Sequence, residues 1–145
     1  MGLRVQKSAV VAMLAFIALG GCQGGVNPVG PPTGRTISYA SEVQPIYDAH
    51  CTSCHAAGGF STVFSGLSFD LTAARSHADT VNQPSSRRAD LILIKPGDSA
   101  NSYLFQKVSS NSPALGETMP LVGERLSSSE LAILRDWIDQ GAANN

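Results

Sequence analysis

The sequence lacks an excess of basic residues and carries few charges of either sign. Only 14% of its 145 residues are Asp, Glu, Lys or Arg, and the formal net charge is −1. Because phosphate binding requires a basic surface, this balance argues against nucleic acid as a partner. A membrane-spanning helix needs about 20 apolar residues, and the uncharged run from Ala9 to Leu19 is too short for one. The chain has room for one modest domain.

The N-terminus has the three-part layout of a secretory signal peptide. Arg4 and Lys7 precede the uncharged run, and Leu19-Gly20-Gly21-Cys22 follows it. The LGGC junction resembles the lipobox of bacterial lipoproteins, which implies cleavage before Cys22 and a lipid on its sulfur. We therefore assign residues 1–21 to a lipoprotein signal peptide. A retained membrane helix, or a plain signal peptide with an incidental free thiol, are the alternatives.

The lipoprotein resemblance also implies a location. Gln23 rather than aspartate follows the cysteine, and in Gram-negative lipoproteins this favours the outer membrane, so we expect a membrane-anchored protein on the periplasmic side. Residues 22–37 are rich in Gly and Pro and read as a tether, which leaves 38–145 as the domain. Loss of Arg4 and Lys7 with the signal peptide changes the net charge to about −3.

Cysteine is scarce, and two of the three cysteines lie in one short motif, Cys51-Thr52-Ser53-Cys54-His55. Outside the cytoplasm, C-x-x-C-H is the pattern for covalent attachment of a c-type haem. Residues three apart share a helical face, so both thiols can form thioethers with the haem vinyl groups while His55 ligates the iron. A disulfide or redox dithiol and a metal site are the alternatives. The sequence offers neither a βαβ context for a dithiol nor a second ligand cluster for zinc.

A haem iron bound by His55 leaves one axial position to fill. Met119, in Gly116-Glu117-Thr118-Met119-Pro120, is the only methionine beyond the signal peptide. Its neutral, soft thioether favours Fe(II) and raises the reduction potential relative to a second imidazole. His77 is the competing ligand, whereas His50 is expected at the surface or edge of the first helix.

Two capping boxes predict helices. Ser41 and Gln44 would open the first, with Val43, Ile46, Tyr47, His50 and Cys54 on one face. Ser127 and Glu130 would open the last, which carries an apolar face and ends at Gly141; the residues of that face are Leu131, Leu134, Trp137 and Ile138. Between them we expect helices over 72–81 and from Asp98 or Ser99 to Val108, a loop over 82–88 and a short apolar run over 91–94.

Over roughly 38–142 these features resemble a small class I c-type cytochrome of the lipoprotein kind. The resemblance implies an all-α fold in which the first and last helices pack together around the haem, with long irregular loops. It also implies a lipid-anchored monohaem electron carrier with one haem c, His55 and Met119 as axial ligands, redox partner proteins and no enzymatic activity. The alternatives are a haem module of a larger respiratory or dehydrogenase complex, and a peroxidase or gas-binding protein with a labile sixth ligand. Four residues are candidates for bonding the haem propionates: Arg87, Arg88, Lys95 and Tyr103.

Overall fold

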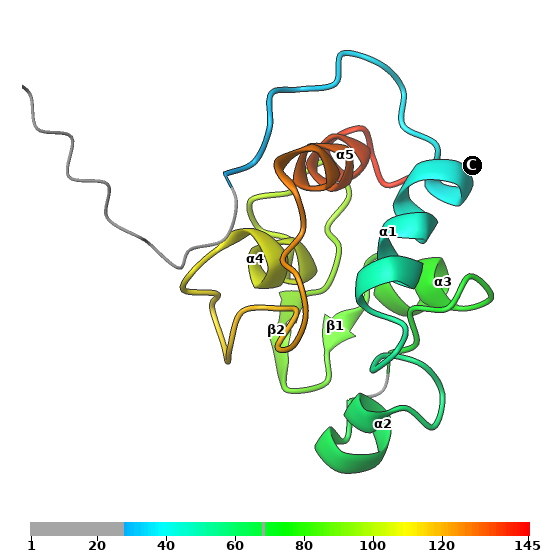
Figure 1. Ribbon diagram of the computed structural model, residues 1–145, viewed down its shortest axis with the longest axis vertical. Helices are drawn as coiled ribbons and strands as arrows, with labels where there is room; N and C mark the ends of the chain where they lie inside the picture. The colour runs from blue at the N-terminus through cyan, green and yellow to red at the C-terminus, as the bar shows by residue number, and fades with distance from the viewer. Residues whose placement is uncertain (1–27, 68) are drawn as a thin grey trace, which may run out of the picture.

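The structure is a computed structural model that describes residues 28–67 and 69–145 (Figure 1). The predicted signal peptide and Cys22 lie outside the described residues. The elements in chain order are η1 (Tyr39–Val43, one π-helical turn), α1 (Gln44–His50), α2 (Phe60–Ser65), α3 (Ser76–Thr80), β1 (Pro84–Ser85), β2 (Arg88–Ile92), α4 (Tyr103–Ser109) and α5 (Ser128–Asp139). In the part of the chain that is described, no helix is long and apolar enough to cross a bilayer.

The expected all-α class is wrong. The described chain is about 36% helical and 8% strand, with five α-helices and a two-stranded antiparallel sheet, a mixed α and β composition. β1 and β2 occupy part of the stretch predicted to be a loop and a short apolar run. The hairpin is held because Ile94, just beyond β2, is fully buried and donates its N–H to the Thr80 carbonyl at 3.0 Å. A two-residue strand such as β1 is too short to show alternation in the sequence.

The hydrophobic core is built around α5. This helix contacts η1 on one side and α4 on the other, and α4 in turn contacts β2 (Figure 1). The apolar face predicted for α5 is confirmed, because its four residues are at most 1% exposed: Leu131, Leu134, Trp137 and Ile138. Tyr47 of α1 and Ile94 complete the same core.

The helix boundaries agree with the sequence only in part. In α5 the Ser127 hydroxyl and the Glu130 carboxylate form the predicted capping box, and Gly141 follows the helix with a φ of 103°. The first capping box is wrong: Ser38, not Ser41, caps the π-helical turn, so the helical segment begins earlier than predicted. The two middle helices, α3 and α4, are shorter than predicted, and α2 was not predicted.

The described part of the predicted tether lies along α5 and then enters η1. The Gly30 N–H donates to the Ser128 carbonyl at 2.9 Å, and a Cβ at this position would lie 2.7 Å from the same oxygen, so glycine permits the approach. Further along, Thr33 donates both its N–H and its hydroxyl to Asp136, at 2.5 and 2.6 Å. Ile37 donates its N–H to Gln140.

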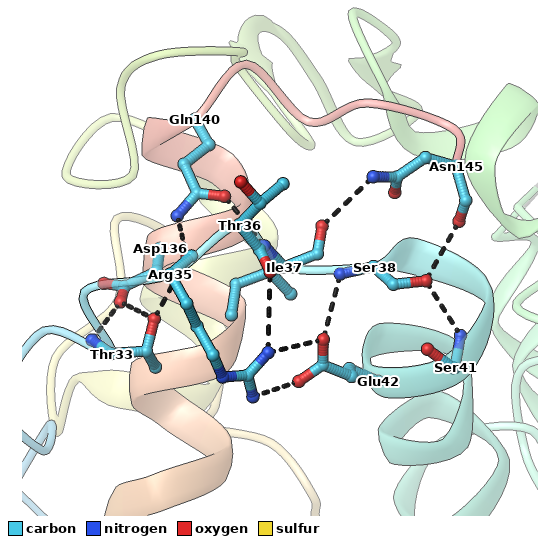
Figure 2. A network of polar contacts seen from close by, with 10 residues as sticks. All are labelled: Thr33, Arg35, Thr36, Ile37, Ser38, Ser41, Glu42, Asp136, Gln140 and Asn145. Atoms are coloured by element: carbon cyan, nitrogen blue, oxygen red, sulfur yellow. Dashed lines mark hydrogen bonds and ion pairs between the residues drawn. The ribbon is translucent and has the colours of Figure 1, made fainter.

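The same segment is bonded to the start of η1 and to the last residue of the chain (Figure 2). Arg35 forms a two-pronged ion pair with Glu42, whose carboxylate also accepts the Ser38 N–H at 3.0 Å. Asn145 accepts the N–H groups of Tyr39 and Ala40, which lie in the first turn of η1. We call this network the N-terminal clasp; it comprises Thr33, Arg35, Thr36, Ile37, Ser38, Ser41, Glu42, Asp136, Gln140 and Asn145.

Candidate functional site

The C-x-x-C-H motif folds as a turn that continues from α1. The Cys51 N–H donates to the Tyr47 carbonyl at 2.8 Å, and the Cys51 carbonyl accepts the N–H groups of Cys54 and His55 at 3.1 and 2.9 Å. Both cysteines are free thiols. The motif is thus wound so that its two cysteines stand one turn apart, the arrangement that its spacing predicted.

The end of the motif is fixed by the start of α2. The Cys54 carbonyl accepts the Ser61 hydroxyl at 2.7 Å and the Ser61 N–H at 3.1 Å. Gly59 sits so close that a Cβ there would lie 2.6 Å from the Cys54 carbonyl oxygen. This tight seating of α2 on the motif explains why a Gly- and Ser-rich sequence forms a short helix here.

The two thiols have different surroundings. Cys51 is half-buried against the hydrophobic core, and burial, with the negative charge of Asp48, raises its pKa to about 12. Cys54 is exposed. Because the thiolate is the nucleophile, the free Cys51 thiol is unreactive at neutral pH and the exposed Cys54 is the more accessible sulfur.

The His55 imidazole is uncharged at neutral pH, and one of its nitrogen atoms is buried. Burial and the nearby Lys107 ammonium lower its pKa below the usual value, so the ring is neutral at pH 7, the form that binds metals. Its Nδ1 atom is buried and has no hydrogen-bond partner among the described residues. The ring of Phe69 lies flat against it, with centroids 4.8 Å apart and planes inclined by 15°.

Met119 lies in a loop that is fastened to α4. Its N–H donates to the Lys107 carbonyl at 2.6 Å, and the Lys107 ammonium bonds the Leu115 carbonyl at 3.1 Å and the Glu117 carbonyl. The Met119 side chain packs partly buried against the core. Lys107 thus bonds the methionine loop to α4 at two carbonyl groups.

The other histidines have partners away from His55. His50 is half-buried and its Nε2 lies 2.9 Å from a Glu130 carboxylate oxygen, so it joins α1 to α5. His77 bonds the Ala142 carbonyl at 2.9 Å and contacts the rings of Tyr39 and Trp137. His77 thereby belongs to the aromatic cluster beside α5.

The residues considered for the propionates all have partners within the protein. Arg87 donates to the Ser65 carbonyl at the end of α2, Arg88 pairs with Asp90, and Lys95 pairs with Asp98. The Tyr103 hydroxyl donates to the Leu115 carbonyl at 2.7 Å. Tyr103 therefore holds the methionine loop together with Lys107.

Sequence reasoning missed two features of this region. The hydroxyl of Tyr47, one turn before Cys51, is buried without a hydrogen-bond partner in the described structure. The apolar periodicity placed Tyr47 in the core correctly, but it carries no information on partners for the hydroxyl. The second feature is apolar surface: α2 exposes Phe60, Val63 and Phe64, and the residues after Met119 expose Leu121 and Val122, all by more than 60%.

The residues fit a covalently attached haem by the chemistry of their donor set. Two thiols stand one turn apart, a neutral imidazole follows them, and a thioether lies on a loop fastened to α4. The five exposed apolar side chains lie in the segments that follow the motif and Met119 in the sequence. In 28–67 and 69–145 no group of three or more His, Cys, Asp or Glu side chains is placed to hold a metal ion.

The chain was compared with protein-family models, with curated proteins and with solved structures, and none of the three comparisons found a match.

Proposed function

We propose that the protein is a monohaem c-type cytochrome that carries electrons. The observation that supports this most directly is the folded C-x-x-C-H turn, in which the half-buried, neutral His55 ring follows two free thiols. A haem bound here would supply an iron that cycles between Fe(III) and Fe(II). Cys51 and Cys54 would hold the group through thioethers, and His55 would supply the nitrogen ligand.

Met119 is the proposed sixth ligand. Its loop is held by Lys107 and Tyr103, and a fixed thioether would occupy the second axial position and exclude small molecules from it. With both positions filled, the chain would transfer electrons to redox partner proteins without acting on a substrate. Resistance of the ferrous protein to carbon monoxide at neutral pH would agree with this role, whereas ready binding would favour the gas-binding or peroxidase alternative.

A lipid on Cys22 would anchor the carrier on the periplasmic side of a membrane. The lipobox-like junction before Cys22 is the support for this part of the proposal. Replacement of Cys22 by serine, followed by fractionation and labelling with a radioactive fatty acid, tests it. Loss of label and release from the membrane are expected, and a labelled Cys22→Ser protein would contradict the assignment.

The deciding experiment is a pyridine haemochrome spectrum of the protein exported from a host that has the haem c maturation machinery. We expect a c-type spectrum that persists in denatured protein, and a mass increased by one haem. A denatured protein that is colourless and has the mass of the bare polypeptide would overturn the proposed function.

A further inference from the structure

The stacking of Phe69 on His55 has no counterpart in the proposed roles of the haem-binding residues. The two rings are nearly parallel, inclined by 15° with centroids 4.8 Å apart. Phe69 is itself partly buried against the hydrophobic core. The inference below rests on the proposed function, because it concerns how His55 would be held as an iron ligand.

A metal-ligating histidine usually donates its second ring N–H to a carboxylate or carbonyl oxygen, and this bond fixes the orientation of the ring. His55 has no such bond: if Nε2 binds the iron, the remaining nitrogen is Nδ1, which is buried and without a partner among the described residues. Water is not an alternative acceptor for a buried atom of this kind without a polar cavity around it. The ring plane of His55 must therefore be set by packing.

The segment that carries Phe69 is rigid enough to do this. The Leu71 N–H donates to the His55 carbonyl at 2.7 Å, which ties the segment to the histidine itself. Asp70 accepts the Ala57 N–H at 3.2 Å and donates its own N–H to Asp79 at 3.1 Å. The two residues that follow Phe69 are thus bonded to the end of the motif and to α3, and these bonds position the Phe69 ring beside His55.

We propose that Phe69 is a positioning residue that fixes the plane of the His55 imidazole by stacking, in place of a hydrogen bond to Nδ1. A ring held in one plane presents Nε2 in one direction only. The stacking partner also covers one face of the imidazole. Without hydrogen bonding at Nδ1, the imidazole keeps the lower basicity of an unassisted ligand.

Electron paramagnetic resonance of the ferric, haem-loaded protein tests this, because the plane of an axial imidazole determines the splitting of the iron d orbitals. We expect Phe69→Leu to retain covalent haem but to shift and broaden the low-spin signals, as the ring samples several planes. Phe69→Tyr, which keeps the stacking ring, should retain the wild-type signals. Phe105→Leu, the same truncation in the core of α4, is the matched control and should also retain them.

A second measurement uses the wild-type protein and so does not depend on the folding of a variant. In the diamagnetic ferrous state, the ring protons of Phe69 and His55 should show nuclear Overhauser effects to each other. Absence of these effects, or a Phe69→Leu protein with unchanged ferric signals, would overturn the positioning role. The haemochrome spectrum separates the two proposals: haem without ring contacts contradicts only this inference, whereas absence of haem contradicts the proposed function.

Discussion

The two ends of the η1–α1 segment are built in opposite ways. At its start, the N-terminal clasp satisfies the helix N–H groups with Ser38, Glu42 and Asn145. Near its end and in the motif that follows, two buried polar atoms have no partner among residues 28–67 and 69–145, the Tyr47 hydroxyl and Nδ1 of His55. Large exposed apolar side chains also gather in α2, which rests on this end.

This difference indicates that the clasp contributes to stability, whereas the motif serves the proposed function. Buried polar groups are normally hydrogen-bonded, so unpartnered ones need an explanation. At the clasp, the explanation is structural, since its bonds join residues 33–38 to α5, to η1 and to Asn145. At the motif, the unpartnered atoms and the exposed apolar surface suit a region completed by a bound group. Substitutions at the two ends should therefore affect different measurements.

The largest effect is expected at the motif. Replacement of both Cys51 and Cys54 by alanine should abolish covalent haem attachment completely, because no thioether can form. Haem staining of the denatured, exported protein measures this. Cys22→Ala, which leaves the motif intact, is the control and should retain the pigment. Pigment in the denatured double variant would contradict covalent attachment of the haem through Cys51 and Cys54.

Met119→Ala should retain the covalent haem but leave the sixth coordination position of the iron free for other ligands. Loss of the thioether removes the ligand that favours Fe(II), so the reduction potential should fall by on the order of 100 mV, a part of the range that axial ligands span. Carbon monoxide should bind the ferrous variant readily. Redox titration and the carbon monoxide difference spectrum measure the two effects, and an unchanged potential would refute the axial assignment.

At the clasp, Asp136→Ala should lower the free energy of unfolding by about 2–4 kcal/mol. Burial opposes ionisation of Asp136, but the hydrogen bonds from Thr33 and the adjacent Arg135 outweigh it and lower the pKa, so a buried carboxylate with several donors is lost. Urea unfolding measures the change. Asp90→Ala removes an exposed carboxylate and should leave the urea midpoint unchanged; equal effects at both positions would contradict the role of the clasp.

Tyr47→Phe should change the free energy of unfolding little, or raise it by up to about 1 kcal/mol, because it removes a buried hydroxyl that has no partner in the described part of the chain. The measurement is again urea unfolding. Tyr39→Phe is the matched comparison and should be destabilising, since the Tyr39 hydroxyl bonds Ser76 and Gln44. A clear loss of stability in Tyr47→Phe would show that a group outside the described protein accepts its hydrogen bond.

The smallest effect is a pH dependence at the clasp. Hydrogen bonds from Arg35 and Ser38 lower the Glu42 pKa from 4.5 to about 2. A lowered carboxyl pKa contributes stability that is present above the unfolded value and lost as pH falls through the folded value. Wild type should therefore exceed Glu42→Gln in melting temperature at pH 7, with the difference shrinking from pH 4.5 and absent below pH 2. The exposed control Glu124→Gln should show no such trend.

Some elements follow from the sequence because local signals suffice for them. The capping box and apolar periodicity of α5 are local, and both are confirmed. The hairpin was missed because β1 is held by long-range bonds around Ile94 rather than by alternation of its own residues. The start of η1 was misplaced because Ser38 and Ser41 are equally suitable caps in sequence, and the tertiary clasp selects Ser38.

The candidate site also has features that local sequence signals predict and features that they do not. The spacing of Cys51, Cys54 and His55 is a local signal, and their haem-binding role stays a prediction. The stacking of Phe69 and the fastening of Met119 by Lys107 depend on contacts between distant segments, which one sequence does not reveal. Nothing in the local sequence around Phe69 indicates that its ring meets the histidine.

The attachment of Gly30 to α5 sets the reach of the proposed lipid anchor. The chain is bound to the body of the protein from Gly30 onward. Only seven residues then lie between Cys22 and Gly30, and at full extension the chain from Cys22 to Gly30 spans at most about 28 Å. A carrier joined to its lipid anchor by so short a segment could not cross a wide compartment. It would work within about its own diameter of the bilayer, and electrons would reach it from partners that come to the same membrane surface.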